Sequence, residues 1–138
     1  MKTIKKTILL VEDEPSLINL YREILKNDYH VLTADNFETA KASIYENSAD
    51  LILLDLLIPV KKNSNVDYTI RQGFELLKVI KKEIKFKKIP VIVLTNLDSA
   101  QDRKTAKDLK ASDFIIKANI LPSELREKVK KILDHNEL

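Results

Sequence analysis

Short apolar runs and segments of helical periodicity alternate five times along the chain. The apolar runs occupy residues 8–11, 31–34, 51–54, 91–94 and 114–116. A short run in which almost every side chain is apolar indicates a strand that is covered on both faces, because a half-exposed strand would alternate apolar with polar residues. Parallel strands need long crossover connections, and the helical segments supply them. The alternation therefore predicts an α/β domain with a parallel sheet between two layers of helices.

The helical segments carry apolar residues at intervals of three and four, which predicts the face that each helix turns to the sheet. The predicted core faces are Leu17, Leu20, Tyr21 and Ile24; Phe37, Ala40 and Ile44; Phe74, Leu77, Ile80 and Ile84; and Leu121, Leu125, Val129 and Ile132. Pro15 and Pro122 suit the first turn of a helix, and Asn36 suits an N-cap. Residues 99–110 contain few apolar residues, so this helix is expected to be loosely held and able to move.

Acidic residues follow two of the apolar runs directly. For five strands joined by right-handed crossovers, we expect the flavodoxin-like (βα)5 fold, a doubly wound parallel five-stranded sheet of order 2-1-3-4-5. Strands one and three are then neighbours, so Glu12, Asp13 and Asp55 meet at one edge of the sheet. Three like charges in one place are costly unless a cation lies among them. This pattern predicts a hard divalent metal with oxygen ligands.

The composition excludes several other kinds of site. The 138 residues include no cysteine, a single glycine, and two histidines at positions 30 and 135. The lack of cysteine excludes disulfides and thiolate chemistry. One glycine is too few for a P-loop or a dinucleotide-binding fingerprint. Two distant histidines argue against a histidine zinc site and a Ser-His-Asp triad, so the acids are expected to carry the chemistry.

Charge and hydropathy predict a cytoplasmic protein that binds neither nucleic acid nor membrane. The formal net charge is +3, and lysines gather in residues 78–88 and 128–131. Their places at helix ends and on solvent-facing positions predict a solvated surface, since cations there complement the helix dipole. The first seven residues are basic, but the apolar run that follows is too short for a signal peptide or a membrane span.

Taken in order, these motifs resemble the receiver domain of two-component response regulators across essentially the whole chain. The resemblance rests on ILLVEDEP at residues 8–15, on Asp55 with Pro59 four residues later, and on GFELL at residues 73–77. It continues with Thr95 at the end of the fourth run and with SDFIIK at residues 112–117. Each piece is weak alone, but the ordered set at matching strand ends is specific. Residues 1–138 are thus expected to form a single receiver domain.

The resemblance implies a phosphorelay switch rather than an enzyme, with Mg²⁺ as its cofactor. Asp55 would accept a phosphoryl group from a sensor histidine kinase or a phosphotransfer protein and form an acyl phosphate. Glu12, Asp13 and Asp55 would hold Mg²⁺ together with the backbone carbonyl of Leu57. Such a site suits the chemistry, because a carboxylate is a weak nucleophile and needs the phosphoryl charge to be neutralised.

The resemblance also implies how the signal would leave the site. Thr95 and Lys117 would bind oxygens of the phosphoryl group, and Phe114 would be an aromatic switch that turns inward when Thr95 moves. The surface of the fourth helix, fifth strand and fifth helix would then change and be read by a downstream protein. Taken singly, Thr95 also fits an ordinary strand residue, Lys117 a surface cation and Phe114 plain core.

Several positions depart from the family pattern. Residues 60–72 make a long connection between the third strand and third helix, which is either a tolerated insertion or an element that gates the pocket or selects the kinase. Ala118 stands where the family usually has a cis-proline, so a trans bond or a strained loop is expected after Lys117. Asn96 replaces a small residue and should narrow access to the phosphoryl group. Apolar Leu57 and Leu97 stand where polar groups can help water attack, which predicts slow self-dephosphorylation.

Two other functions remain open at this point. A pseudo-receiver would keep the fold as a phosphorylation-independent protein-interaction module, although such a module has no need to gather acids. A phosphatase of the haloacid dehalogenase type would also use an aspartyl nucleophile. That family needs an acid two residues after the nucleophile, where this chain has Leu57.

Overall fold

The five strands form one parallel sheet of order β2-β1-β3-β4-β5 in the computed structural model, which describes residues 4–136. The strands are β1 (Thr7–Val11), β2 (His30–Ala34), β3 (Leu51–Leu54), β4 (Val91–Thr95) and β5 (Asp113–Ile116). β1 pairs with β2 on one side and with β3 on the other. The predicted flavodoxin-like fold and strand order are confirmed. Residues 1–3 and 137–138 of the predicted domain lie outside the described part.

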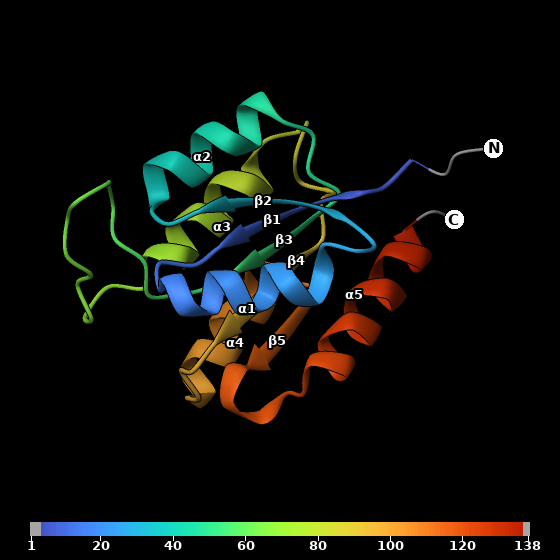
Figure 1. Cartoon of the computed structure of the whole chain (residues 1–138). Coiled ribbons are helices and arrows are strands. Elements are labelled where there is room, and N and C mark those ends of the chain that lie inside the picture. The colour runs from blue at the N-terminus through green and yellow to red at the C-terminus, as the bar shows by residue number, and fades with distance from the viewer. Residues whose placement is uncertain (1–3, 137–138) are drawn as a thin grey trace.

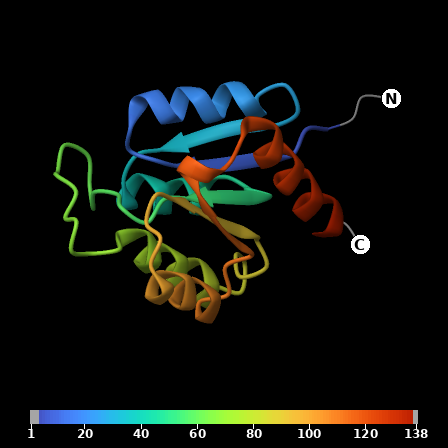
Figure 2. The ribbon, with the colours of Figure 1, turned by 90° about the horizontal axis from the view of Figure 1, so that it is seen from below.

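Helices cover both faces of the sheet (Figures 1 and 2). They are α1 (Pro15–Leu25), α2 (Phe37–Glu46), α3 (Gln72–Lys82), α4 (Ala100–Asp108) and α5 (Pro122–Asn136), with a short 3-10 helix η1 (Lys117–Asn119) before the last. α1 and α5 pack on one face, and α2, α3 and α4 pack on the other. β3 is therefore buried along its whole length, as its uniformly apolar sequence requires.

The predicted helix starts are confirmed, but three of the predicted core residues are wrong. α1 begins at Pro15, α5 begins at Pro122, and the side chain of Asn36 accepts a hydrogen bond from the N–H of Thr39. Leu20, Ile84 and Leu121 are exposed by 46%, 83% and 64%. The core line of α1 runs through Tyr21 and Leu25 instead, while Ile84 and Leu121 lie beyond helix ends. An apolar residue outside the helix loses the periodicity that would turn it inward.

The connection between β3 and α3 projects from the edge of the sheet at which the strands end (Figure 1). It follows Asp55 and runs to Arg71, the residue before α3. The predicted weak packing of α4 is confirmed in part, because Ala106 is its only buried apolar residue while Asp102 is buried as well. Within residues 4–136, no helix has the length and apolar character needed to cross a membrane.

Candidate functional site

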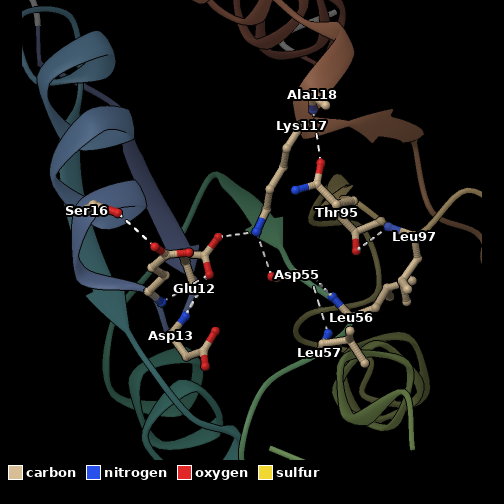
Figure 3. A network of polar contacts seen from close by, with 12 residues as sticks. Glu12, Asp13, Ser16, Asp55, Leu56, Leu57, Thr95, Leu97, Lys117 and Ala118 are labelled. Atoms are coloured by element: carbon tan, nitrogen blue, oxygen red, sulfur yellow. Dashed lines mark hydrogen bonds and ion pairs between the residues drawn. The ribbon is translucent and has the colours of Figure 1, made fainter. Parts of the chain in front are cut away.

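Asp55 lies directly after β3, where the sheet still holds its backbone. Its N–H donates to the carbonyl of Val11 on β1 at 3.0 Å. One carboxylate oxygen, Oδ1, accepts from the N–H of Leu56 at 2.7 Å. The second oxygen, Oδ2, turns towards Lys117 (Figure 3). Because the side chain is only 9% exposed, this carboxylate depends on its protein partners rather than on water.

Glu12 and Asp13 follow β1, the neighbouring strand. Glu12 is 2% exposed, and its Oε2 accepts from the N–H groups of Asp13 at 2.9 Å and Glu14 at 3.2 Å. Its other oxygen, Oε1, accepts from Lys117. Asp13 is half-buried and points into the same space as Asp55 (Figure 3). The three predicted acids are thus brought together by the parallel pairing of β1 with β3.

Lys117 supplies the cation at the centre of this cluster. It is the first residue of η1 and follows directly after β5, which ends at Ile116. Its Nζ lies 2.7 Å from Oδ2 of Asp55 and also binds Oε1 of Glu12. The predicted partner of Lys117 is a phosphoryl oxygen. In this structure its partners are the two carboxylates (Figure 3).

Burial and charge shift the ionisation of these groups. Desolvation by burial, followed by repulsion from Asp55, raises the pKa of Glu12 to about 6, against the opposing attraction of Lys117. The same two causes raise the pKa of Asp13. Burial alone would lower the pKa of Lys117, but the attraction and hydrogen bonds of Asp55 and Glu12 outweigh it, so that this pKa is raised. The acids therefore repel one another strongly enough to favour an added cation.

The donor set fits Mg²⁺. Glu12, Asp13 and Asp55 each offer a carboxylate oxygen, and these oxygens lie within 4.8 Å of one another. Mg²⁺ is a hard cation that prefers oxygen ligands and binds through one or two carboxylates, water and phosphate oxygens. A cluster of three acids with a single lysine carries the negative charge that such an ion offsets. The chemistry of the residues thus agrees with the expected cofactor.

A hollow of about 540 Å³ opens beside Asp55 and is large enough to admit a phosphoryl group. Its wall contains the three acids, Lys117, Leu57 and the end of β4 with Thr95, Asn96 and Leu97. Thr95 is buried, and its Oγ1 accepts from the N–H of Leu97 at 3.3 Å. Its hydroxyl hydrogen remains available to donate. Thr95 and Lys117, both predicted site residues, therefore share one pocket with Asp55.

Gly73, the only glycine of the chain, fixes the backbone behind Asp55. Its N–H donates to the carbonyl of Leu56 at 3.0 Å. A Cβ at this position would lie 2.3 Å from the carbonyl oxygen of Asp55 and 2.8 Å from Cα of Leu56. Both contacts are with backbone, which cannot turn aside as a side chain can. The start of α3 thus packs directly against the proposed phosphoacceptor only because residue 73 has no side chain.

Asn96 and Ala118, two positions that depart from the family pattern, are hydrogen-bonded to each other. Among the described residues no peptide bond is cis, so the bond between Lys117 and Ala118 is trans. The N–H of Ala118 donates to Oδ1 of Asn96 at 3.0 Å (Figure 3). A proline at position 118 would have no N–H to donate. Asn96 thus ties the turn after Lys117 to the end of β4, which keeps the lysine at the pocket.

Phe114, the predicted switch residue, lies outside this pocket. It is half-buried, packs against the core on the α2, α3 and α4 face, and has the guanidinium of Arg103 at 5.1 Å from its ring centroid. Arg103 belongs to α4 and also binds Asp98 at 2.6 Å. The aromatic ring therefore contacts α4 and does not line the pocket.

An ion pair between Arg71 and Asp102 was not predicted from the sequence. Arg71 precedes α3, and its Nε lies 3.2 Å from Oδ1 of the buried Asp102 in α4. The spacing of Ser99 and Asp102 is that of a helix capping box, a local signal that was visible in the sequence. The partnership with Arg71 was not visible, because it depends on the path of the long connection.

Comparison with known proteins places most of this chain in one family. The sequence pattern of the family described as response regulator receiver domain matches residues 8–130. A curated relative, Histidine kinase P4 of Formosa agariphila, is 32% identical over 91% of this chain and 9% of its own length. The probable transcriptional regulator ycf27 of Cyanidium caldarium is 34% identical over 91% of this chain and 45% of its own. The chain spans about half or less of the length of these relatives.

Solved structures agree with the fold and the family. A CheY-like response regulator receiver domain protein from Methanospirillum hungatei has a TM-score of 0.82 and 26% identity, and the alignment covers 97% of this chain and 98% of that one. The phosphorylated cyanobacterial phytochrome response regulator RcpA has a TM-score of 0.74 and 34% identity, with 94% of this chain and 91% of that one covered. Motifs, topology and relatives agree, and the chain belongs to the response regulator receiver domain family of two-component signalling.

Proposed function

We propose that this receiver domain accepts a phosphoryl group on Asp55, with Mg²⁺ bound, from a histidine kinase or a phosphotransfer protein. The observation that carries the proposal is the meeting of three acids, Lys117 and Thr95 around one hollow at the ends of β1, β3 and β4. Receiver domains are phosphoacceptor switches rather than enzymes. Self-phosphorylation from a small donor and self-dephosphorylation are therefore the reactions expected of this chain.

Transfer uses the oxygen of Asp55 that faces the pocket. Oδ1 is held by the backbone N–H of Leu56, whereas Oδ2 is held by the side chain of Lys117, which can move, so Oδ2 is the oxygen that attacks the phosphorus. The bond between phosphorus and the donor's imidazole nitrogen breaks, its electron pair stays on that nitrogen, and the new acyl phosphate bond forms. Lys117 moves its hydrogen bond from Oδ2 to a phosphoryl oxygen, and the hydroxyl of Thr95 donates to another. Both groups stabilise the charge on the transferred group.

The residues that would hold Mg²⁺ are Glu12, Asp13, Asp55 and, through its backbone carbonyl, Leu57. When bound, the ion neutralises negative charge on the phosphoryl group and on the acids. Glu12 already binds two backbone N–H groups through one oxygen, which keeps its carboxylate directed at the site. The residues thus orient the ligand oxygens before phosphate arrives.

The proposed output surface is formed by α4, β5 and α5 and is read by a downstream protein. α4 has one buried apolar residue, so little hydrophobic packing opposes its movement. Thr95 ends β4 just before the segment that leads into α4, and Phe114 on β5 lies beneath Arg103 of α4. A shift of Thr95 towards a phosphoryl oxygen would therefore be transmitted to this surface.

We expect the chain, incubated with acetyl phosphate and Mg²⁺, to gain the mass of one phosphoryl group, and Asp55→Asn to gain none. The amide of asparagine is not a nucleophile towards phosphorus, whereas its shape preserves the fold. Intact-protein mass spectrometry measures the adduct, and omission of Mg²⁺ from the wild type should reduce it strongly. Asp50→Asn, which changes an acid at the opposite end of β3, is the matched control and should remain labelled.

The other outcomes of this experiment select the competing functions. A wild-type chain that stays unmodified would favour the pseudo-receiver, an interaction module that works without phosphorylation. Continuous release of phosphate would favour the aspartyl phosphatase. An adduct that persists in Asp55→Asn would place the modification on another residue and overturn the assignment of the phosphoacceptor.

A further inference from the structure

The long connection between β3 and α3 forms part of the phosphoryl pocket. Val66 and Tyr68 line the same hollow as Asp55 and the residues at the end of β4. Tyr68 is 73% exposed, so its ring stands at the mouth of the hollow rather than in the core. Together with Leu57 and Leu97, these side chains add apolar surface to a lining that also contains Asn96 and the acids. The connection therefore contributes residues to the wall of the site.

The first end of the connection is fastened to α2. The N–H of Phe37 donates to the carbonyl of Pro59 at 2.9 Å, and the N–H of Glu38 donates to the carbonyl of Val60 at 2.9 Å. These are N–H groups of the first turn of α2, which have no partner within their own helix. Using them fixes the path of the chain as it leaves the site.

The far end is fastened by Arg71. Its Nη1 donates to the carbonyl of Tyr68 at 3.2 Å, while Nε and Nη2 donate to Oδ1 and Oδ2 of Asp102 at 3.2 and 3.3 Å. Asp102 is 6% exposed, and its Oδ2 also accepts from the hydroxyl of Ser99 at 2.8 Å. A bidentate ion pair between a guanidinium and a buried carboxylate fixes the geometry of both side chains. Arg71 thus joins the backbone at Tyr68 to the first turn of α4.

The hydrolysis of an acyl phosphate depends on what surrounds it. A water molecule attacks the phosphorus in line, the bond from phosphorus to the Asp55 oxygen breaks, the carboxylate is restored, and the water proton passes to solvent. In-line attack requires this water to approach the phosphorus from the side opposite the Asp55 oxygen, so it must pass through the hollow. Leu57, Val66 and Leu97 have no group that could orient it or accept its proton. Apolar side chains held at the mouth therefore slow the reaction.

We propose that Arg71 is a positioning residue that holds Val66 and Tyr68 at the mouth of the phosphoryl pocket and thereby lengthens the life of the acyl phosphate on Asp55. This inference rests on the proposed function. It assigns the long connection a role in setting how long the signal lasts. The same ion pair also holds α4, a helix with a single buried apolar residue.

The test is the half-life of the acyl phosphate in the full chain. The wild type and its variants are phosphorylated with acetyl phosphate and Mg²⁺, the donor is removed by desalting, and the loss of the adduct is followed by intact mass. We expect Tyr68→Ala and Arg71→Gln each to shorten the half-life by about fivefold, equivalent to roughly 1 kcal/mol of activation free energy. The double variant should be little faster than the faster single one, because both changes open the same wall.

Two matched controls separate this role from general loosening of the fold. Tyr45→Ala removes an exposed tyrosine that lines a different surface hollow, and Arg126→Gln breaks an arginine–aspartate pair between α5 and the residues after α1. Both should keep the wild-type half-life. Equal half-lives in wild type, Tyr68→Ala and Arg71→Gln would overturn the inference and leave the proposed function standing. Absence of any adduct in the wild type would overturn both.

Discussion

Replacement of Gly73 by alanine is expected to lower the free energy of unfolding by about 3 kcal/mol, the upper part of the range for an overpacked core. In an ordinary helix the same change is favourable by about 1 kcal/mol. The sign reverses here because the new Cβ would meet the Asp55 carbonyl oxygen at 2.3 Å and Cα of Leu56 at 2.8 Å. Backbone must move to relieve these contacts, and the hydrogen bond from Gly73 to Leu56 must stretch.

The backbone that moves is that of the proposed phosphoacceptor, so the variant should also lose phosphorylation. Urea unfolding measures the stability, and labelling by acetyl phosphate in the absence of urea measures the second effect. Glu75→Ala, two residues further along α3, removes only an exposed pair with Lys78 and should change stability by less than about 0.5 kcal/mol. A Gly73→Ala variant as stable as the wild type would show that α3 does not press on the segment after β3.

The sheet and the acidic cluster could be predicted because both depend on local signals. Each strand is a short apolar run, and in a parallel sheet all strands end at the same edge. Once β1 and β3 are neighbours, Asp55 must lie close to Glu12 and Asp13 whatever the rest of the chain does. The signals that start α1 at Pro15 and cap α2 at Asn36 are equally local.

The parts that could not be predicted depend on where helices end and how loops run. Ile84 fits the periodicity of α3, but the helix stops at Lys82 and leaves this side chain exposed. The pairing of Arg71 with Asp102 spans 31 positions and is one choice among 24 basic and 21 acidic residues. No local pattern selects that choice, since it follows from the path of the connection after β3.

We expect Lys117→Met to lower the free energy of unfolding by about 3 kcal/mol at neutral pH without Mg²⁺, the cost typical of leaving buried charges without their partner. The side chains of Lys117, Glu12 and Asp55 are 8%, 2% and 9% exposed. Methionine fills similar space but provides no charge. Two carboxylates that now share one ammonium group would then repel each other, with Asp13 beside them.

The stability that Lys117→Met loses should depend on pH. The pKa of Glu12 is raised from 4.5 to about 6 in the folded wild type, so protonation favours the folded state. Its contribution to stability is complete below pH 4.5 and is lost as the pH rises through about 6. In the wild type, Lys117 lowers the pKa of Glu12, so this pKa should rise further in Lys117→Met. The variant should therefore lose more stability than the wild type as the pH rises. The difference between wild type and variant should therefore shrink on acidification.

Mg²⁺ should restore the variant at neutral pH, because an ion bound only by the folded state stabilises it by mass action and replaces the missing positive charge. Urea unfolding at about pH 5 and about pH 8, with EDTA or with excess MgCl₂, measures all four conditions. Lys128→Met breaks a surface pair with Asp113 and should cost less than about 1 kcal/mol in every condition. If Lys117→Met lowers the free energy of unfolding equally at both pH values and with Mg²⁺, then lost packing and not unpaired carboxylates causes the destabilisation.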